Sequence, residues 1–197
     1  QPIILEKNQL LVQDFSLIKE VKCGDLNEAN SPYVIQMIKE ATNGCLNRDF
    51  AGLITGPVSK EVIANSGFDF KGHTEYIGSL CKTSPVMSFI SNDMKLALAT
   101  THVSLGEVPS LITQDLLMNI CEIISFDLNQ FFGISEPRIA ILGLNPHAGE
   151  NGLLGNEEIQ TIIPAIESMQ NKGLNIFGPY AADTALLQNN DMDIIVS

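Results

Sequence analysis

The stretch RIAILGLNPHAGENG, residues 138–152, joins an uninterrupted apolar run to a turn rich in proline, glycine and polar side chains. Such a run, bounded by turn residues, is typical of a strand buried on both faces of a parallel sheet. A helix is expected next, at residues 156–170, with Glu157 and Glu158 in its first turn, where acidic side chains interact favourably with the helix dipole. The stretch therefore predicts a strand, a tight loop and a helix in succession.

Other parts of the chain alternate in a similar way. Ser31 and Pro32 are expected to open a helix that runs toward Gly44, with the serine hydroxyl as N-cap and the proline in the first turn. The remaining expected elements are a buried strand at 50–55, a short helix at 58–65, a hairpin of 86–90 with 95–100, a helix at 114–131 and strands at 174–177 and 193–197. This order predicts an α/β fold with a mostly parallel sheet flanked by helices.

The composition is that of a folded protein. With 197 residues, 45% of them hydrophobic, the chain can form one large domain or parts of two, and no linker or repeat marks a boundary. Its net charge of −12 argues against nucleic acid or an acidic membrane surface as the main partner, and no apolar run approaches the ~20 residues of a membrane span. The four cysteines form no C-x-x-C pair, which favours reduced thiols in a cytoplasmic protein.

Both ends of the chain look cut. The first residues, QPIILE, contain neither an initiator methionine nor the basic head of a signal peptide. The last residues, DIIVS, stop where a strand should deliver its next residue to a loop. We therefore expect an internal piece of a longer protein.

All three histidines lie in compact polar motifs at the ends of apolar runs. These motifs are GHTE at 72–75, TTH at 100–102 and NPHAGE at 145–150. His102 and His147 follow two expected strands, and ligands of parallel sheets gather beyond the carboxyl ends of the strands. Imidazole is the commonest metal ligand, so these two residues are candidate ligands of a cation. A zinc site usually has three protein ligands, so a third ligand has to come from elsewhere.

Lys60, His73 and Thr74 are candidates for binding a polar substrate. The motif GPVSK at 56–60 would present free backbone N–H groups and the lysine ammonium to a phosphate, although an ordinary turn with a solvated lysine remains open. Gly72 lets the backbone approach a ligand at His73 and Thr74, but a plain helix N-terminus with Thr74 as cap and an exposed His73 is the alternative.

The pair Asp183 and Thr184 follows the expected strand at 174–177. It is interpreted either as a wall of the site or as a helix cap. The glycines 149, 152 and 155 form G-x-x-G-x-x-G, which differs from the G-x-G-x-x-G of a Rossmann turn. A dinucleotide, if bound, would therefore bind in another way.

Taken together and in order, the motifs GPVSK, GHTE, TTH, LGLNPHAGENG, GNEEIQTIIP and GPYAADT resemble the 4-hydroxythreonine-4-phosphate dehydrogenase family of vitamin B6 biosynthesis. The similarity runs from about Cys45 to Ser197, and its most specific part is NPHAGE followed by EEI and TIIP. The resemblance implies an oxidoreductase related in fold to isocitrate and isopropylmalate dehydrogenases. It also implies NAD or NADP as cofactor, a divalent metal (zinc first, with magnesium or cobalt as alternatives), and a homodimer whose shared active sites lie between domains.

Carried over by position, the resemblance assigns His73 and Thr74 to substrate binding and His102 and His147 to the metal. It puts the third histidine in a Tyr-His-Asp-Gln-Gly motif directly after a strand like that at 193–197, beyond the last residue of this chain. The family's later substrate-binding lysine, asparagine and arginine, and much of its dinucleotide site, would also lie beyond it. The chain is thus expected to be an internal part of a two-domain dehydrogenase, and no residue stands out as the general base.

In the family reaction, a phosphorylated hydroxy-amino acid, 4-phosphooxy-L-threonine, is oxidised and then loses carbon dioxide. The motifs do not separate this substrate from 4-phospho-D-threonate or 4-phospho-D-erythronate, which close relatives oxidise. A metal-binding or phosphate-binding fragment without redox activity is the alternative from a different class.

Overall fold

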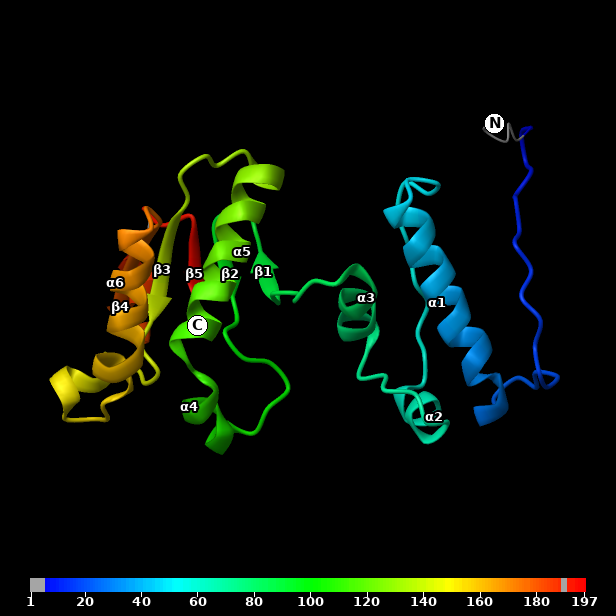
Figure 1. The fold of residues 1–197 in the computed structure, drawn as a ribbon, viewed down its shortest axis with the longest axis horizontal. Helices are drawn as coiled ribbons and strands as arrows, with labels where there is room; N and C mark the ends of the chain where they lie inside the picture. The colour runs from blue at the N-terminus through cyan, green and yellow to red at the C-terminus, as the bar shows by residue number, and fades with distance from the viewer. Residues whose placement is uncertain (1–5, 189–190) are drawn as a thin grey trace. The chain divides into compact units, whose positions relative to one another are not determined.

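Figure 1 shows the fold in a computed structural model that describes residues 6–188 and 191–197. The chain divides between Pro85 and Val86 into two compact units. Within residues 6–85 the first unit forms the helices α1 (Ser31–Leu46), α2 (Lys60–Asn65) and α3 (His73–Cys81). The second unit contains a mixed, mostly parallel sheet with helices against it, which confirms the expected α/β fold.

The core of the first unit lies where its three helices meet. It consists of Ile35 and Ile38 of α1, Ile63 of α2 and Phe70, which precedes α3. Ser31 is the first residue of α1 rather than its N-cap, a position that Asn30 takes. The Ser31 hydroxyl instead donates to the Val62 carbonyl at 3.3 Å and accepts from the Ser66 hydroxyl at 2.7 Å, and thus ties the start of α1 to α2.

The prediction of a buried strand at residues 50–55 is wrong. This segment has no regular secondary structure, and the Ile54 side chain is 99% exposed. A strand satisfies its backbone groups by pairing with a neighbour, and no segment within residues 6–85 forms a strand that it could join. The helix that follows begins at Lys60 instead of Val58, because the Ser59 side chain accepts from the Val62 N–H at 3.4 Å and caps it.

The sheet of the second unit has the strand order β1-β2-β5-β3-β4. The strands are β1 (Ser88–Ile90), β2 (Lys95–Ala97), β3 (Arg138–Leu142), β4 (Asn175–Tyr180) and β5 (Ile194–Val196). β1 and β2 form the expected antiparallel hairpin, whereas the pairs β2–β5, β5–β3 and β3–β4 are parallel. The strand expected from the run at 138–144 thus lies inside the sheet with a parallel neighbour on each side.

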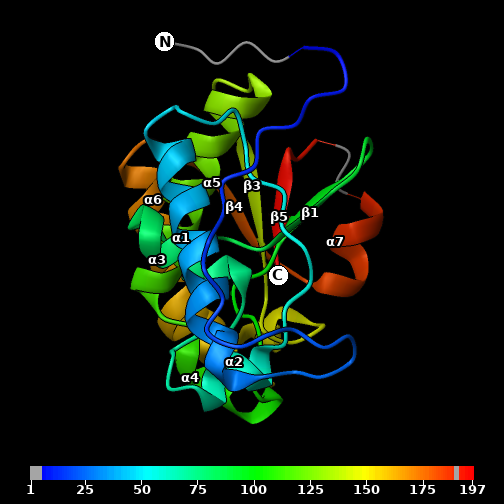
Figure 2. The same ribbon diagram turned by 90° about the vertical axis from the view of Figure 1, so that its right-hand side faces the viewer.

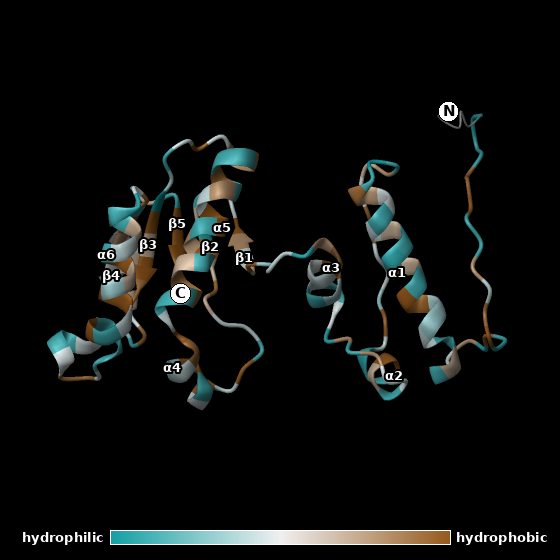
Figure 3. Cartoon of the chain, in the orientation of Figure 1, coloured by the Kyte–Doolittle hydropathy of each residue, from teal (hydrophilic) through white to brown (hydrophobic). Residues whose placement is uncertain are grey.

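Both faces of the sheet are covered. Ile139 and Ile141 of β3 pack with α5 (Gln114–Phe132) and α6 (Ile163–Asn171), whereas Ala140 and Leu142 face the cluster that contains Ala185 of α7 (Ala182–Gln188). Figure 2 shows α7 on the opposite side of the sheet from α5 and α6. Because neither face meets solvent, β3 is apolar and buried at every position after its first residue, Arg138, and the strands are largely brown in Figure 3.

The helix α5 packs its apolar stripe on the sheet. The stripe consists of Leu117, Ile120, Cys121, Ile124 and Leu128, all buried in the core, with Leu116 half-buried beside it. Burial, with a smaller contribution from Glu122, raises the pKa of the Cys121 thiol to about 12. This stripe is therefore part of the core, and Cys121 is a protonated, unreactive side chain near neutral pH.

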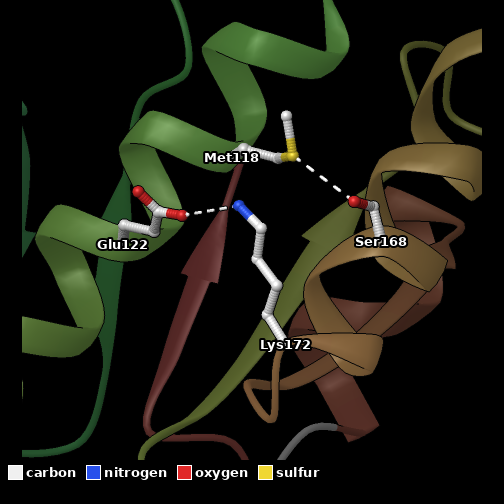
Figure 4. Close-up of polar contacts among 4 residues, drawn as sticks. All are labelled: Met118, Glu122, Ser168 and Lys172. Carbon is white, nitrogen blue, oxygen red and sulfur yellow. Dashed lines mark hydrogen bonds and ion pairs between the residues drawn. The ribbon is translucent and has the colours of Figure 1, made fainter.

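Polar contacts join α5 to α6 at the surface (Figure 4). Lys172, just after α6, pairs with Glu122 of α5 at 3.1 Å, and the Ser168 hydroxyl donates to the Met118 sulfur at 3.6 Å. Both members of the ion pair are about half exposed, so it contributes little stability. The apolar surface beneath is what holds the helices together.

Three short elements complete the second unit: α4 (Val108–Leu111) and two 3-10 turns, Leu105–Glu107 and Ala148–Gly152. The helix expected at 156–170 begins as a π-helical turn, Glu158–Ile162, that continues into α6. In residues 6–188 and 191–197, no helix combines the length and apolar character that crossing a membrane requires.

Candidate substrate and cation site

The strands β2, β5 and β3 run parallel, so their carboxyl ends lie at one edge of the sheet. The pairing continues past the strands, because the Ser197 N–H donates to the Ala97 carbonyl at 2.9 Å and the Ala99 N–H donates to the Ser197 carbonyl at 2.7 Å. The chain leaves β2 toward His102 and β3 toward His147 at this edge. Adjacent strands are about 4.8 Å apart, so β2 and β3 lie roughly 10 Å apart across β5.

The edge is hollowed by a cavity of ≈190 Å³. Its wall includes Thr100 from the segment after β2, Gly143 and Leu144 after β3, and Ser197 after β5. The two histidine loops therefore begin at the rim of one cavity, beyond the carboxyl ends of parallel strands, which is where ligands of such sheets gather.

His147 belongs to a tightly bonded loop. The backbone N–H of His147 donates to the Asn145 side-chain oxygen at 3.0 Å, and the same oxygen accepts from the backbone N–H of Gly149 at 3.1 Å. The Asn145 amide donates in turn to the Leu154 carbonyl at 3.0 Å. The His147 side chain itself is exposed, so a fixed backbone carries an imidazole that solvent and ligands can reach.

A buried acid lies beneath this loop. Glu158 is 2% exposed, and one of its carboxylate oxygens accepts from the Leu144 N–H at 2.8 Å. Sequence reasoning assigned Glu158 only to the helix dipole and gave Asn145 no role. Asn145 could have been noticed from the Asn-Pro-His order, because asparagine side chains often accept from backbone N–H groups two residues on. The contact of Glu158 with a loop that precedes it by fourteen residues needed the structure.

His102 lies in a different kind of loop. Its φ of 56° puts a non-glycine residue in the left-handed region, and its side chain is exposed. The next turn is closed by Ser104 and Glu107, because the Glu107 carboxylate accepts from the Ser104 N–H at 3.2 Å and from its hydroxyl at 2.5 Å. These hydrogen bonds hold the pKa of Glu107 below its usual value.

The side chains fit a divalent cation in part. His102 and His147 supply two imidazoles, the donors that zinc commonly takes, from loops at one sheet edge. Within residues 6–188 and 191–197, no group of three or more His, Cys, Asp or Glu side chains is arranged to hold a metal ion. A cation at this edge would need further ligands.

In the first unit, α3 begins at His73 with Gly72 as its N-cap residue. The alternative interpretation, a helix N-terminus, is therefore correct in its position, but its further details are wrong, because Thr74 does not cap the helix and His73 is not exposed. Thr74 is an exposed residue of the first turn, and His73 is half-buried with its ring edge-on to Phe70, the centroids 5.9 Å apart. The His73 Nε2 atom is buried and has no hydrogen-bond partner among the described residues.

Lys60 lies beside the same turn. A Cβ on residue 72 would stand 3.3 Å from the Lys60 Nζ atom and 2.9 Å from a carboxylate oxygen of Glu75. Glycine at position 72 therefore lets the lysine ammonium come close to the backbone that leads into His73 and Thr74. Lys60 and the Glu75 carboxylate thus lie at the turn that leads into the other two substrate-binding candidates, His73 and Thr74.

A mostly apolar cavity of ≈380 Å³ adjoins this turn. His73 forms part of its wall, together with residues of α1 and of the irregular segment at 53–58. An unpartnered buried nitrogen costs about 1–3 kcal/mol, which a ligand hydrogen bond would recover. The His73 ring is thus placed to bind a polar group that enters this cavity.

Asp183 and Thr184 lie in the first turn of α7 and are exposed. The Thr184 hydroxyl donates to the Ala181 carbonyl at 3.3 Å, so it bonds within its own helix rather than capping it. The pair is part of the helix that covers the second face of the sheet.

These features define an α/β protein with a mostly parallel sheet and two histidine-bearing loops that follow the carboxyl ends of its strands. The family model described as "Pyridoxal phosphate biosynthetic protein PdxA" matches residues 4–197, and the chain belongs to this family. A curated relative from Pseudomonas aeruginosa, named 4-hydroxythreonine-4-phosphate dehydrogenase, is 45% identical over 177 residues, which are 89% of this chain and 54% of the relative.

Solved structures agree with this assignment. The 4-hydroxythreonine-4-phosphate dehydrogenase of Klebsiella pneumoniae is 32% identical, with a TM-score of 0.81 over 90% of this chain and 55% of that one. A terephthalate 1,2-cis-dihydrodioldehydrogenase from Burkholderia xenovorans LB400 is 25% identical, with a TM-score of 0.67 over 88% of this chain and 56% of that one. The chain thus spans about half the length of the curated relatives it matches.

Proposed function

We propose that the full-length protein oxidises 4-phosphooxy-L-threonine with NAD or NADP, in the presence of a divalent cation, in pyridoxal phosphate biosynthesis. The names of the relatives support the oxidation and the pathway. The single observation that supports a phosphorylated, polar substrate is the approach of the Lys60 Nζ atom to Gly72, next to His73, whose Nε2 atom is buried and unpartnered within the described residues.

Lys60 and the α3 N-terminus provide the positive potential that a phosphate requires in a protein of net charge −12. His73 and Thr74 are suited to hold the polar groups of the same molecule, because an imidazole nitrogen and a hydroxyl can each donate or accept. Phe70 keeps the His73 ring in place from the side. The proposed role of these residues is to bind and orient the substrate.

His102 and His147 are proposed as two ligands of the cation, with zinc as the first choice and magnesium or cobalt as alternatives. A bound divalent cation would supply positive charge that makes the substrate hydroxyl easier to deprotonate and stabilises negative charge on that oxygen later. The exposure of both imidazoles at one sheet edge supports this role. The remaining ligands would come from outside the described residues.

The proposed reaction balances as an oxidation followed by a decarboxylation. The carbon that bears the hydroxyl gives a hydride to the nicotinamide ring, the hydroxyl gives up its proton, and a ketone results. The carboxylate then lies β to a carbonyl and leaves as carbon dioxide, and the electron pair left on the α-carbon is held as the enolate until that carbon takes up a proton from solvent. We assign no residue of this chain as the general base.

The remaining parts of the proposal concern assembly and location. The protein is proposed to be a two-domain dehydrogenase that forms a homodimer with shared active sites, as the resemblance to its family implies. A cytoplasmic location is proposed from the four cysteines, all of which are free thiols in the described part of the chain.

The test is an assay of the full-length protein for NADH and NADPH formation. 4-Phosphooxy-L-threonine should be oxidised faster than 4-phospho-D-threonate and 4-phospho-D-erythronate, EDTA should abolish turnover, and Zn²⁺, Mg²⁺ or Co²⁺ should restore it. Preference for either acid would correct the substrate, whereas no turnover of any compound would refute the dehydrogenase proposal and favour a binding protein.

Variants separate the roles of the residues. Lys60→Ala should raise KM for the phosphorylated substrate by about 10-fold or more, because it removes a charge-assisted hydrogen bond. Lys71→Ala is the matched control, since Lys71 is an exposed lysine of the same unit, and it should leave KM unchanged. Equal effects of the two substitutions would contradict a specific phosphate contact.

A further inference from the structure

Glu158 is an ionisable side chain that the proposed reaction does not use, although it is 2% exposed. One carboxylate oxygen accepts from the Leu144 N–H at 2.8 Å, and the other has no hydrogen-bond partner among the described residues. Burial of a carboxylate costs several kcal/mol unless it is well bonded. An apolar side chain would therefore suit this position better if packing were its only role.

The carboxylate stands against both ends of the loop that carries His147. A Cβ on residue 143 would lie 2.5 Å from the Ala148 Cα atom and 3.0 Å from one Glu158 oxygen, and a Cβ on residue 149 would lie 2.6 Å from the other oxygen. Glycine at position 143 thus lets the loop fold back at Ala148, and glycine at both positions lets it close onto the acid. The carboxylate fills the space between the start and the end of segment 143–149.

The same segment is held from within by Asn145. Its side-chain oxygen accepts from the N–H groups of His147 and Gly149, at 3.0 and 3.1 Å. One Glu158 oxygen accepts from the N–H of Leu144, the residue before Asn145, and the other oxygen lies against Gly149. The backbone on each side of His147 is therefore fixed by two acceptor side chains, one inside the loop and one from the start of the following helix.

We propose that Glu158 is a positioning residue that holds His147 in place for cation binding. This inference rests on the proposed role of His147 as a cation ligand. A site whose ligands are already in place binds its ion more tightly, and loss of such a supporting contact typically costs about 10–100-fold in metal affinity. Glu158 acts through the Leu144 N–H and through its packing against the two glycines, without touching the ion.

The experiment measures Zn²⁺ affinity of the metal-free, full-length protein by competition with a chromophoric chelator, well below the melting temperature of every variant. Glu158→Leu keeps side-chain bulk but removes the acceptor, and it should weaken Zn²⁺ binding by about 10–100-fold. Glu158→Gln retains an oxygen that can accept from Leu144 and should restore affinity to within about 3-fold of the wild type. Glu167→Leu, at an exposed acid of α6, is the matched control and should change nothing.

If Glu158→Leu does not fold, Glu158→Asp serves instead, because it keeps the charge and withdraws the carboxylate by one methylene. Zn²⁺ affinity should again fall by about 10-fold. Unchanged affinity in a folded variant would show that Glu158 has a purely structural role and would overturn the inference. An equal loss in Glu158→Gln and Glu158→Leu would also overturn it, since the charge rather than the acceptor would then matter.

His147→Ala is measured alongside. Weaker Zn²⁺ binding in His147→Ala with normal binding in Glu158→Leu would refute the positioning role and leave the proposed function standing. Unchanged binding in His147→Ala would refute the cation role of His147 and the inference together. Weaker Zn²⁺ binding in both His147→Ala and Glu158→Leu, with recovery in Glu158→Gln, supports the cation role of His147 and the positioning role of Glu158.

Discussion

The two histidine loops leave the same edge of the sheet but are built differently. The loop of His147 is fixed from two sides, by Asn145 within it and by the buried carboxylate of Glu158 beneath it. The loop of His102 is followed by a local turn in which an exposed serine and an exposed glutamate bond each other. One candidate ligand is therefore held in advance by tertiary contacts, and the other depends on bonds within a few residues of chain.

The largest effect is expected for Gly149→Ala. Gly149 has φ +74°, and a Cβ there would stand 2.6 Å from a Glu158 oxygen, so left-handed strain and a steric clash should together cost about 2–4 kcal/mol. Gly133→Ala is the control, because Gly133 has φ +71° with no atom near its Cβ position and should cost only about 1 kcal/mol. Urea unfolding measures both, and equal losses would mean that the contact with Glu158 does not constrain the loop.

A smaller loss is expected for Asn145→Ala. Two backbone N–H groups lose their acceptor, so we expect the free energy of unfolding to fall by about 1–2 kcal/mol and the Gly149 amide to exchange faster with deuterium. The control is Asn92→Ala, in an exposed turn where the asparagine side chain forms no hydrogen bond with the described residues. Slow exchange at Gly149 in the Asn145 variant would show that Glu158 alone is enough to hold the loop.

Cation binding should affect the two loops unequally. If His102 and His147 both bind Zn²⁺, hydrogen exchange in residues 101–107 of the full-length protein should slow by about tenfold, whereas residues 145–154 should change less because they are already bonded. Mass spectrometry of peptides, with and without Zn²⁺, measures the difference. Equal protection of both segments would contradict the contrast between a fixed and a locally held loop.

The smallest effect is expected for Ser104→Ala. The hydrogen bonds from Ser104 lower the pKa of Glu107, so the substitution should raise that pKa toward its ordinary value, as followed by NMR titration. A carboxyl group whose pKa is lower in the folded state stabilises the protein at pH values above its unfolded-state pKa. This stabilisation is lost as the pH falls through the folded-state pKa. Because Glu107 is fully exposed, the unfolding midpoint at pH 7 should not measurably change. A marked loss of stability would mean that the His102 loop relies on this turn more than its exposure indicates.

Two apolar runs show how far sequence reasoning reaches. Residues 50–55 and 138–144 were both predicted to be buried strands. The second forms β3 between two parallel neighbours, whereas the first has no strand to pair with in its own unit and leaves Ile54 exposed. An apolar run indicates that a segment suits a strand, but pairing requires a second segment with free backbone groups.

The candidate site likewise shows which features the sequence can predict and which need the structure. The motifs alone selected Lys60, His73, Thr74, His102 and His147, because each is a polar residue beside a predicted strand end, turn or helix start. Their environment could not be predicted in the same way. The approach of Lys60 to Gly72 and the bond from Leu144 to Glu158 join residues that are separated in the chain, and the half-buried His73 ring lines a cavity together with residues of α1.

The sequence by itself determined the α/β class, the family and the candidate residues, since these depend on local periodicity and on short motifs that can be read in order. Only the tertiary structure decided which runs became strands, where the His73 ring and Lys60 lie, and that a buried glutamate supports the loop of His147. These features depend on contacts between residues that are distant in the chain. Their energy comes from the burial of apolar side chains and the pairing of backbone groups, which a local sequence pattern cannot predict.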